Sequence, residues 1–166
     1  LVDAGGQTAV GYGLGIFVIA EARVTLIGCR LLSNRLIALL AEAEAGRIRV
    51  VGSSISRTES FKASGVARNG QGVVVRHNSE RMWLVASRFV RNRMAGIFVQ
   101  DAALTVDGCM VADTLPGTGP DVGRAQEFSD GLVANGAKEL AIVDTLVTEH
   151  QRAGLLLNDS AGVKVR

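Results

Sequence analysis

Short segments in which apolar and polar residues alternate recur along the chain, and all follow one eleven-residue pattern. Each segment begins with an apolar residue, any residue and a second apolar residue, which is the alternation of a β-strand. The sixth residue of every copy is small and the eighth is apolar. The complete copies are VTLIGCRLLSN (24–34), IRVVGSSISRT (48–58), MWLVASRFVRN (82–92), LTVDGCMVADT (104–114) and LAIVDTLVTEH (140–150), and a truncated copy begins at Val163. The pattern therefore predicts a repeat architecture.

A second motif, glycine followed by three apolar residues, precedes most of these segments. Its copies begin at Gly15, Gly72, Gly96, Gly131 and Gly154. In the second repeat, Leu36-Ile-Ala-Leu takes the same place without the glycine. Because side chains alternate across a strand, the second residue after the glycine points outward. This predicts one outward column that is apolar at every position, formed by Phe17, Ala38, Val74, Phe98, Val133 and Leu156. Either the loops cover this column, which is the interpretation we favour, or it is a contact surface.

The spacing of the segments predicts the path of the chain. The starts at 24, 48, 82, 104, 140 and 163 differ by 24, 34, 22, 36 and 23 residues. A short step is the length of one turn of a parallel β-solenoid with three short strands, and a long step is the same turn with an insertion. The insertions are Glu59–Gln71 and Leu115–Asp130, and both come directly before a glycine-led strand. We therefore expect about six turns, with long loops on alternate turns at one corner and no long α-helix.

The repeated glycine motif and the apolar-x-apolar-x-x-Ser-x-apolar-x-x-Asn pattern resemble the right-handed parallel β-helix proteins of the pectate-lyase-like superfamily. The alternately looped turns are similar to those of uncharacterised bacterial surface repeat proteins in that group. The resemblance implies an all-β, right-handed parallel β-helix and a secreted or cell-surface location. The superfamily contains lyases, hydrolases, epimerases, tailspikes, adhesins and scaffolds, so the fold alone does not select a function. Residues 1–166 are expected to form a single domain that is a fragment of a longer chain.

Composition narrows the range of partners. Apolar residues make up 48% of the 166 residues, which excludes an intrinsically disordered chain. The net charge is only +2 and the aromatic residues are five Phe, one Trp and one Tyr, so nothing in the composition favours a nucleic-acid partner. The longest apolar stretches fall far short of the ~20 residues of a membrane span.

The sequence offers little catalytic chemistry. The Gly-His-Gly and Arg-x-Lys elements of polygalacturonase-like hydrolases are missing from it. The two histidines, His77 and His150, fall at different corners of the predicted turns, so they do not form one metal or acid–base centre. We therefore predict no catalytic residue, no metal site and no cofactor. Because loops carry function on a rigid scaffold, the candidate binding residues are those of the second insertion: Asp121, Arg124, Glu127 and Asp130.

Three further expectations concern side chains that share a column. Cys29 and Cys109 both occupy the sixth position but stand three turns apart, ~14 Å at ~4.8 Å per turn. A disulfide allows at most ~7 Å between Cα atoms, so both thiols should be free.

The tenth position of the pattern reads Ser33, Arg57, Arg91, Asp113 and Glu149, which predicts an ion pair between Arg91 and Asp113. Trp83 should point outward, one turn from Arg49 and within reach of a cation–π contact with it.

The functional hypothesis is a non-catalytic β-helix scaffold or adhesion and binding module, with a polysaccharide or another protein as partner. The alternative is a carbohydrate-processing β-helix of the polysaccharide lyase or hydrolase type, active or degenerate. A third hypothesis is self-association through the apolar column or the ends of the coil. Whether the protein is an enzyme is left open, with the residues favouring a non-enzyme.

Overall fold

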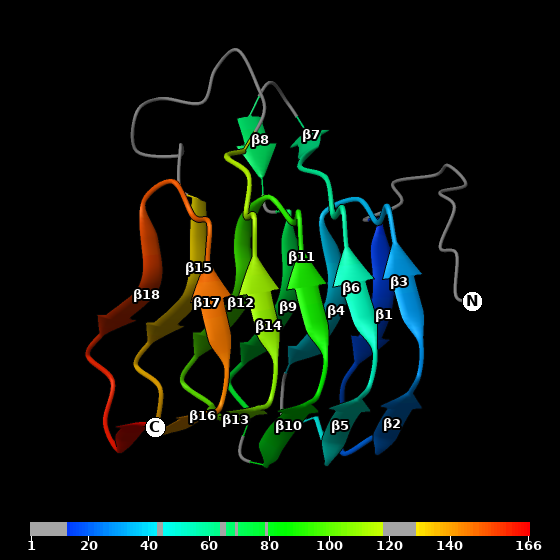
Figure 1. Ribbon diagram of the computed structural model, residues 1–166. Coiled ribbons are helices and arrows are strands. Elements are labelled where there is room, and N and C mark those ends of the chain that lie inside the picture. Colours follow the sequence, from blue (N-terminus) through cyan, green and yellow to red (C-terminus); the bar gives the residue numbers. More distant parts are fainter. Residues whose placement is uncertain (1–12, 43–44, 64–65, 69, 79, 118–128) are drawn as a thin grey trace.

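The computed structural model describes residues 13–42, 45–63, 66–68, 70–78, 80–117 and 129–166. These residues form β-strands and the connections between them (Figure 1). No helix long and apolar enough to cross a membrane occurs among them. The expectation of an all-β chain built from parallel strands is confirmed for this part of the protein.

The strands assemble into three sheets, each made of parallel strands. The first sheet contains β1 (Leu14–Val18), β4 (Ile37–Glu42), β9 (Gln71–Arg76), β12 (Met94–Gln100), β15 (Ser129–Asn135) and β18 (Ala153–Asn158). The second contains β2 (Val24–Ile27), β5 (Ile48–Val51), β10 (Arg81–Val85), β13 (Ala103–Asp107), β16 (Glu139–Val143) and β19 (Val163–Val165). The third contains β3 (Arg30–Leu32), β6 (Ser54–Ser56), β11 (Arg88–Val90), β14 (Met110–Ala112) and β17 (Leu146–Thr148). The chain visits the three sheets in this order and then begins again, and we call one such passage a repeat.

The eleven-residue pattern maps directly onto the second and third sheets. Its first residues form a strand of the second sheet, as in the pairing of Met82 with Ile48 and with Leu104. Its last residues form a strand of the third sheet, where Phe89 pairs with Ile55 and with Val111. All six of these side chains are almost completely buried. Apolar residues thus stack on apolar residues from repeat to repeat and form one continuous core between the sheets.

A ladder of small side chains holds the corner between the second and third sheets. The Ser53 amide donates to Ser87 Oγ at 3.1 Å, and the Ser87 amide donates to Cys109 Sγ at 3.4 Å. The ladder continues at both ends: the Cys29 amide donates to Ser53 Oγ, and the Cys109 amide to Thr145 Oγ1. Each buried amide therefore finds its acceptor in the side chain of the following repeat. Both thiols are free, as predicted, and burial raises the pKa of the Cys109 thiol.

Buried polar side chains form a second column at the corner between the third and first sheets. Asn92 accepts the Thr58 amide on Oδ1 at 3.2 Å and donates from Nδ2 to the Ile55 carbonyl at 3.1 Å. This side chain packs against the glycine-led strand, because a Cβ added to Gly72 would lie 2.7 Å from Asn92 Nδ2. The close approach explains why glycine begins most of these strands.

The glycine-led strand of the second repeat lies two residues later than predicted. Leu40, and not Ala38, is opposite Phe17 on one side and Val74 on the other. Ala38 is fully buried and packs into the main core. The assignment of Ala38 to the outward column is therefore wrong. Ala38 follows Asn34 by four residues, the same spacing that separates Asn92 from Gly96, so it takes the place of the glycine.

Both insertions leave from the corner between the third and first sheets, as predicted. The first lies between β6 and β9 and contains the antiparallel pair β7 (Phe61–Ala63) and β8 (Val66–Arg68), and the second lies between β14 and β15 (Figure 1). Arg93 links the starts of the two insertions, with Nε 2.5 Å from Glu59 Oε2 and Nη1 2.9 Å from the Pro116 carbonyl. One guanidinium thus holds the starts of both insertions, which lie two repeats apart.

The small-side-chain ladder makes a testable contribution to stability. Ser87→Ala should lower the free energy of unfolding by about 1–3 kcal/mol, because the buried Ser53 amide loses its acceptor. Ser87→Cys should cost less, since Cys109 shows that a sulfur can act as acceptor in this column. Urea unfolding followed by circular dichroism measures both changes.

The matched control is Ser56→Ala, which removes a half-buried hydroxyl from the outer face of the third sheet. It should change the free energy of unfolding by less than ~0.5 kcal/mol. An equal loss in Ser56→Ala and Ser87→Ala would contradict the role assigned to the ladder.

Candidate functional site

An apolar groove of about 310 Å³ lies on the outer face of the first sheet, where β12, β15 and β18 run side by side. Its floor consists of Phe98, Val133 and Leu156, which are register partners in successive repeats. All three side chains are half-buried. These are three of the residues that the sequence predicts in one outward column, and the strand register confirms their alignment.

The remainder of that column is not uniformly open. Val74 is 3% exposed and Leu40 5%, and both pack with Ile37 in a small cluster separate from the main core. Phe17, at the other end, is 50% exposed. Val74, which the sequence pattern also places in the candidate contact surface, is buried in this outer cluster. The accessible part of the column is the groove at Phe98, Val133 and Leu156, together with Phe17. That these residues form a contact surface stays a prediction.

Polar pairs border the apolar groove. Asp130 accepts from Arg152 Nε at 2.8 Å and forms a second, very short bond with Nη2 of the same guanidinium. The Asp130 side chain is only 1% exposed, whereas that of Arg152 is 40% exposed, so the carboxylate is desolvated and the guanidinium reaches it from the surface. The hydrogen bond to Asp130 raises the pKa of Arg152. Asn158 Nδ2 donates to Asn135 Oδ1 at 3.0 Å, and this pair also lines the groove.

The predicted binding residues of the second insertion divide into two groups. Asp130 belongs to β15, paired with Arg152 one repeat later, so it is an anchored residue of the sheet and not a solvated loop carboxylate. Asp121, Arg124 and Glu127 lie outside the described residues. Their proposed role in binding stays a prediction.

The histidines lie at different corners, as the sequence predicts. His150 stands at the corner between the third and first sheets, with Nε2 3.2 Å from the Val111 carbonyl and no hydrogen-bond partner at Nδ1 among the described residues. Burial lowers the pKa of His150, while the Val111 carbonyl and nearby carboxylates act in the opposite direction. His77 lies on an exposed corner between the first and second sheets, with Nδ1 3.4 Å from Asp101 Oδ2. The described residues contain no cluster of three or more His, Cys, Asp and Glu side chains that could hold a metal ion.

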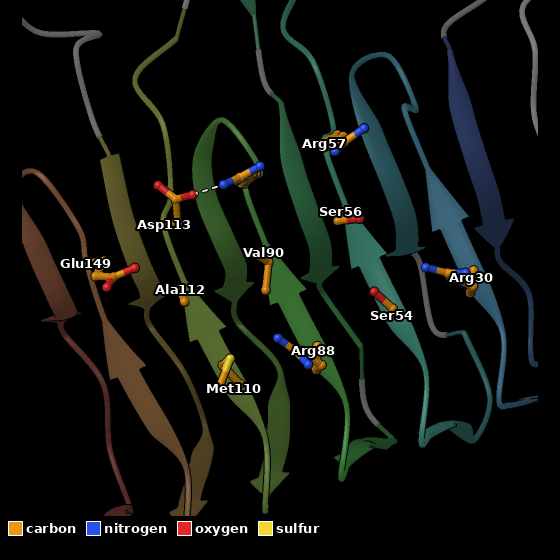
Figure 2. Close-up of a pocket in the computed structure, with 11 residues that line it drawn as sticks. Arg30, Ser54, Ser56, Arg57, Arg88, Val90, Met110, Ala112, Asp113 and Glu149 are labelled. Carbon is orange, nitrogen blue, oxygen red and sulfur yellow. Dashed lines mark hydrogen bonds and ion pairs between the residues drawn. The ribbon is translucent and has the colours of Figure 1, made fainter.

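A second groove, which we call the arginine groove, lies on the outer face of the third sheet (Figure 2). Its volume is about 500 Å³. Its lining includes the cations Arg30, Arg57, Arg88 and Arg91, the hydroxyls of Ser54 and Ser56, and the acids Asp113 and Glu149. The predicted ion pair is present, with Arg91 Nε 2.7 Å from Asp113 Oδ2.

Sequence reasoning identified only part of the arginine groove. It found the column that contains Arg57 and Arg91, but it did not use Arg30 and Arg88, which occupy the seventh position of the pattern. These two align through Ser54, the seventh residue of the repeat between them. Reading the seventh and tenth positions together would have shown four arginines on one face.

Trp83 contacts a different arginine from the one expected. Arg49 is its register partner, but the guanidinium over the indole ring is that of Arg47, 5.6 Å from the ring centroid. Arg47 lies just before β5, so its long side chain reaches the ring from the strand end. A cation–π contact to Trp83 is therefore present as predicted, but its partner is Arg47 and not Arg49.

Comparison of the chain with protein-family models, with curated proteins and with solved structures finds no match. Inference about function therefore rests on the fold and on the side chains of the two grooves.

The low pKa of His150 predicts a pH dependence of stability. The folded state binds a proton at His150 less readily than the unfolded chain, whose histidine pKa is ~6.5. The contribution of neutral His150 is therefore present above about pH 6.5 and is lost as the pH falls through the lower pKa of the folded state. His150→Asn, which places the residue of Asn34 and Asn92 in this column, should lose less stability than the wild type on acidification.

Urea unfolding at about pH 7.5 and about pH 5.5, on either side of the histidine pKa, measures this difference. His77→Asn is the matched control and shows whether the change is specific to position 150. A His150→Asn protein with the pH dependence of the wild type would contradict the assignment.

Proposed function

We propose that the chain is a right-handed parallel β-helix of about six turns that acts as a non-catalytic binding module of a secreted or cell-surface protein. Three strands per repeat, visited in a fixed order, and side-chain ladders along the axis support the β-helix. Right-handedness follows from the strong preference of parallel crossover connections. The resemblance of the repeat pattern to pectate-lyase-like proteins supports both the fold and the extracellular location.

The apolar groove is the observation that carries the binding function. Ligand sites typically combine an apolar surface with a few placed polar groups, and this groove has both. Phe98, Val133 and Leu156 offer an apolar floor, and the Asn135–Asn158 pair offers amides to a ligand. Sugars present apolar ring faces and many hydroxyls, so a polysaccharide segment is the ligand class that this groove fits best.

The bonding of the titratable groups described above supports a role without catalysis. A general acid or base must reach the substrate with a proton to give or accept. The Asp130 carboxylate is occupied by Arg152, and His150 Nε2 is engaged with the Val111 carbonyl. The Cys109 thiol is part of the corner ladder, and its raised pKa keeps it protonated. These groups stabilise the β-helix and leave binding to the surface side chains.

Binding to a panel of neutral and acidic polysaccharides, measured by affinity electrophoresis or calorimetry, tests the proposal. Leu156→Asn should weaken binding about tenfold, because it replaces part of the apolar floor at a half-buried position. Phe98→Ala should have the same effect on binding but also lower the melting temperature, since Phe98 packs against the outer cluster.

Ile27→Ala is the matched control, because Ile27 is an exposed apolar residue on the second sheet. It should leave polysaccharide binding unchanged. Binding that is insensitive to Leu156→Asn and Phe98→Ala would contradict the assignment of the groove. A larger solution mass that Leu156→Asn reduces to that of the monomer would point instead to self-association through the same surface.

The carbohydrate-processing alternative makes a different prediction from the binding module. Prolonged incubation with each bound polysaccharide should produce no new reducing ends and no unsaturated products. Release of either product by the wild type, abolished by Asp130→Asn, would replace the binding proposal with an enzymatic one.

A further inference from the structure

Three guanidinium groups of the arginine groove have no ion-pair partner among the described residues. They belong to Arg30, Arg57 and Arg88, whereas the fourth, Arg91, is paired with Asp113. Unpaired cations that gather on one face repel one another, and an anion placed among them relieves that repulsion. The groove therefore has the electrostatic character of an anion site.

The spacing of these cations follows from the repeat. Arg30 and Arg88 occupy one column, two repeats apart, which corresponds to ~10 Å at the ~4.8 Å separation of neighbouring strands. The repeat between them contributes Ser54 in the same column and Arg57 at the end of the strand. In Figure 2, Ser54 lies between Arg30 and Arg88, and Ser56 lies farther along the same strand, toward Arg57. The short serine side chains leave the surface open and add hydroxyl donors between the guanidiniums.

The donors favour a tetrahedral oxyanion. A carboxylate presents two oxygens in one plane and is satisfied by the fork of a single guanidinium. A sulfate group presents three oxygens in different directions, so it can accept from two arginines and a serine hydroxyl at once. All the cations here are arginines, whose planar forks suit such multiple contacts better than lysine does.

The acidic end of the groove limits where the ligand lies. Asp113 and Glu149 follow Arg91 along the tenth-position column, so the face changes from positive to negative along the axis. An anionic chain is attracted over the repeats of Arg30, Arg57 and Arg88 and repelled beyond Asp113. This bounded site, in a protein of net charge +2 and few aromatic residues, does not suit a nucleic acid, which needs a longer basic track and stacking surfaces.

We propose that the arginine groove binds a sulfated polysaccharide through Arg30, Arg57 and Arg88, with Ser54 and Ser56 as additional donors. This site lies on the third sheet and is separate from the apolar groove on the first. The inference goes beyond the proposed function and does not depend on it. A substitution at Phe98 or Leu156 that abolishes binding in the apolar groove should leave binding in the arginine groove unchanged, because neither residue lines the arginine groove.

Calorimetric titration of the whole chain with a size-defined heparin oligosaccharide tests the proposal. The double variant Arg57→Gln/Arg88→Gln should bind at least about tenfold more weakly, since two charge-assisted contacts are lost. Arg49→Gln is the matched control: it removes one exposed arginine from the second sheet and should leave the affinity within about twofold. An equal loss in the control and the double variant would overturn the proposal, because it would indicate general charge attraction.

A gain of affinity provides a second test, one that misfolding cannot imitate. Asp113→Asn removes an anion and releases the guanidinium of Arg91, so it should tighten heparin binding several-fold. Unchanged or weaker binding in Asp113→Asn would count against the groove as the site.

The choice of ligand class is tested by replacing the probe. Chemically desulfated heparin and polygalacturonate keep the carboxylates, and single-stranded DNA keeps a polyanionic backbone. All three should bind at least about tenfold more weakly than heparin if sulfate groups supply the contacts. Equal binding of any of them, or no binding of heparin by the wild type, would overturn the assignment to a sulfated polysaccharide.

Discussion

Axial register between successive repeats is the constraint on which the rest of the structure depends. The buried Ser53 amide is satisfied only when Ser87 of the next repeat stands directly opposite, and the same holds for the Ser87 amide and Cys109. A slip of one residue would separate these partners and would also turn the inward aliphatic residues to the outside. The close approach of Asn92 to Gly72 enforces the same alignment at the next corner.

Once register is fixed, each repeat has inward positions that must be apolar and outward positions that need not be. The two grooves are consequences of this freedom: the first sheet carries an apolar floor at Phe98, Val133 and Leu156, and the third carries a cluster of arginines. The axial register also leaves the length of the surface connections unconstrained, and the two insertions are the result. They leave from one corner, where closing a longer surface loop costs little, and Arg93 holds the starts of both.

Features that recur in every repeat can be predicted from the sequence. Contacts that depend on how far a long side chain extends cannot. The small-residue column and the strands of the second and third sheets follow from one eleven-residue pattern, because neighbouring repeats impose the same demand at every position. The sequence pattern assigns Ala38 to the wrong face because this strand lacks the glycine that marks the start of the others. The feature that this repeat does share is the four-residue distance from the buried Asn34 to the start of the strand. Arg47 over Trp83 and Arg152 on Asp130 depend on how far a long side chain extends, which strand register does not determine.

The direction of the corner ladder has a consequence for how the protein is made. In every bond of that ladder the amide belongs to the earlier repeat and the acceptor side chain to the later one. A chain that emerges from the ribosome amino end first therefore presents each corner before its acceptor exists, and each repeat is completed only when its successor docks. During synthesis, the corner amide of the most recently completed repeat therefore lacks its side-chain acceptor until the next repeat packs against it.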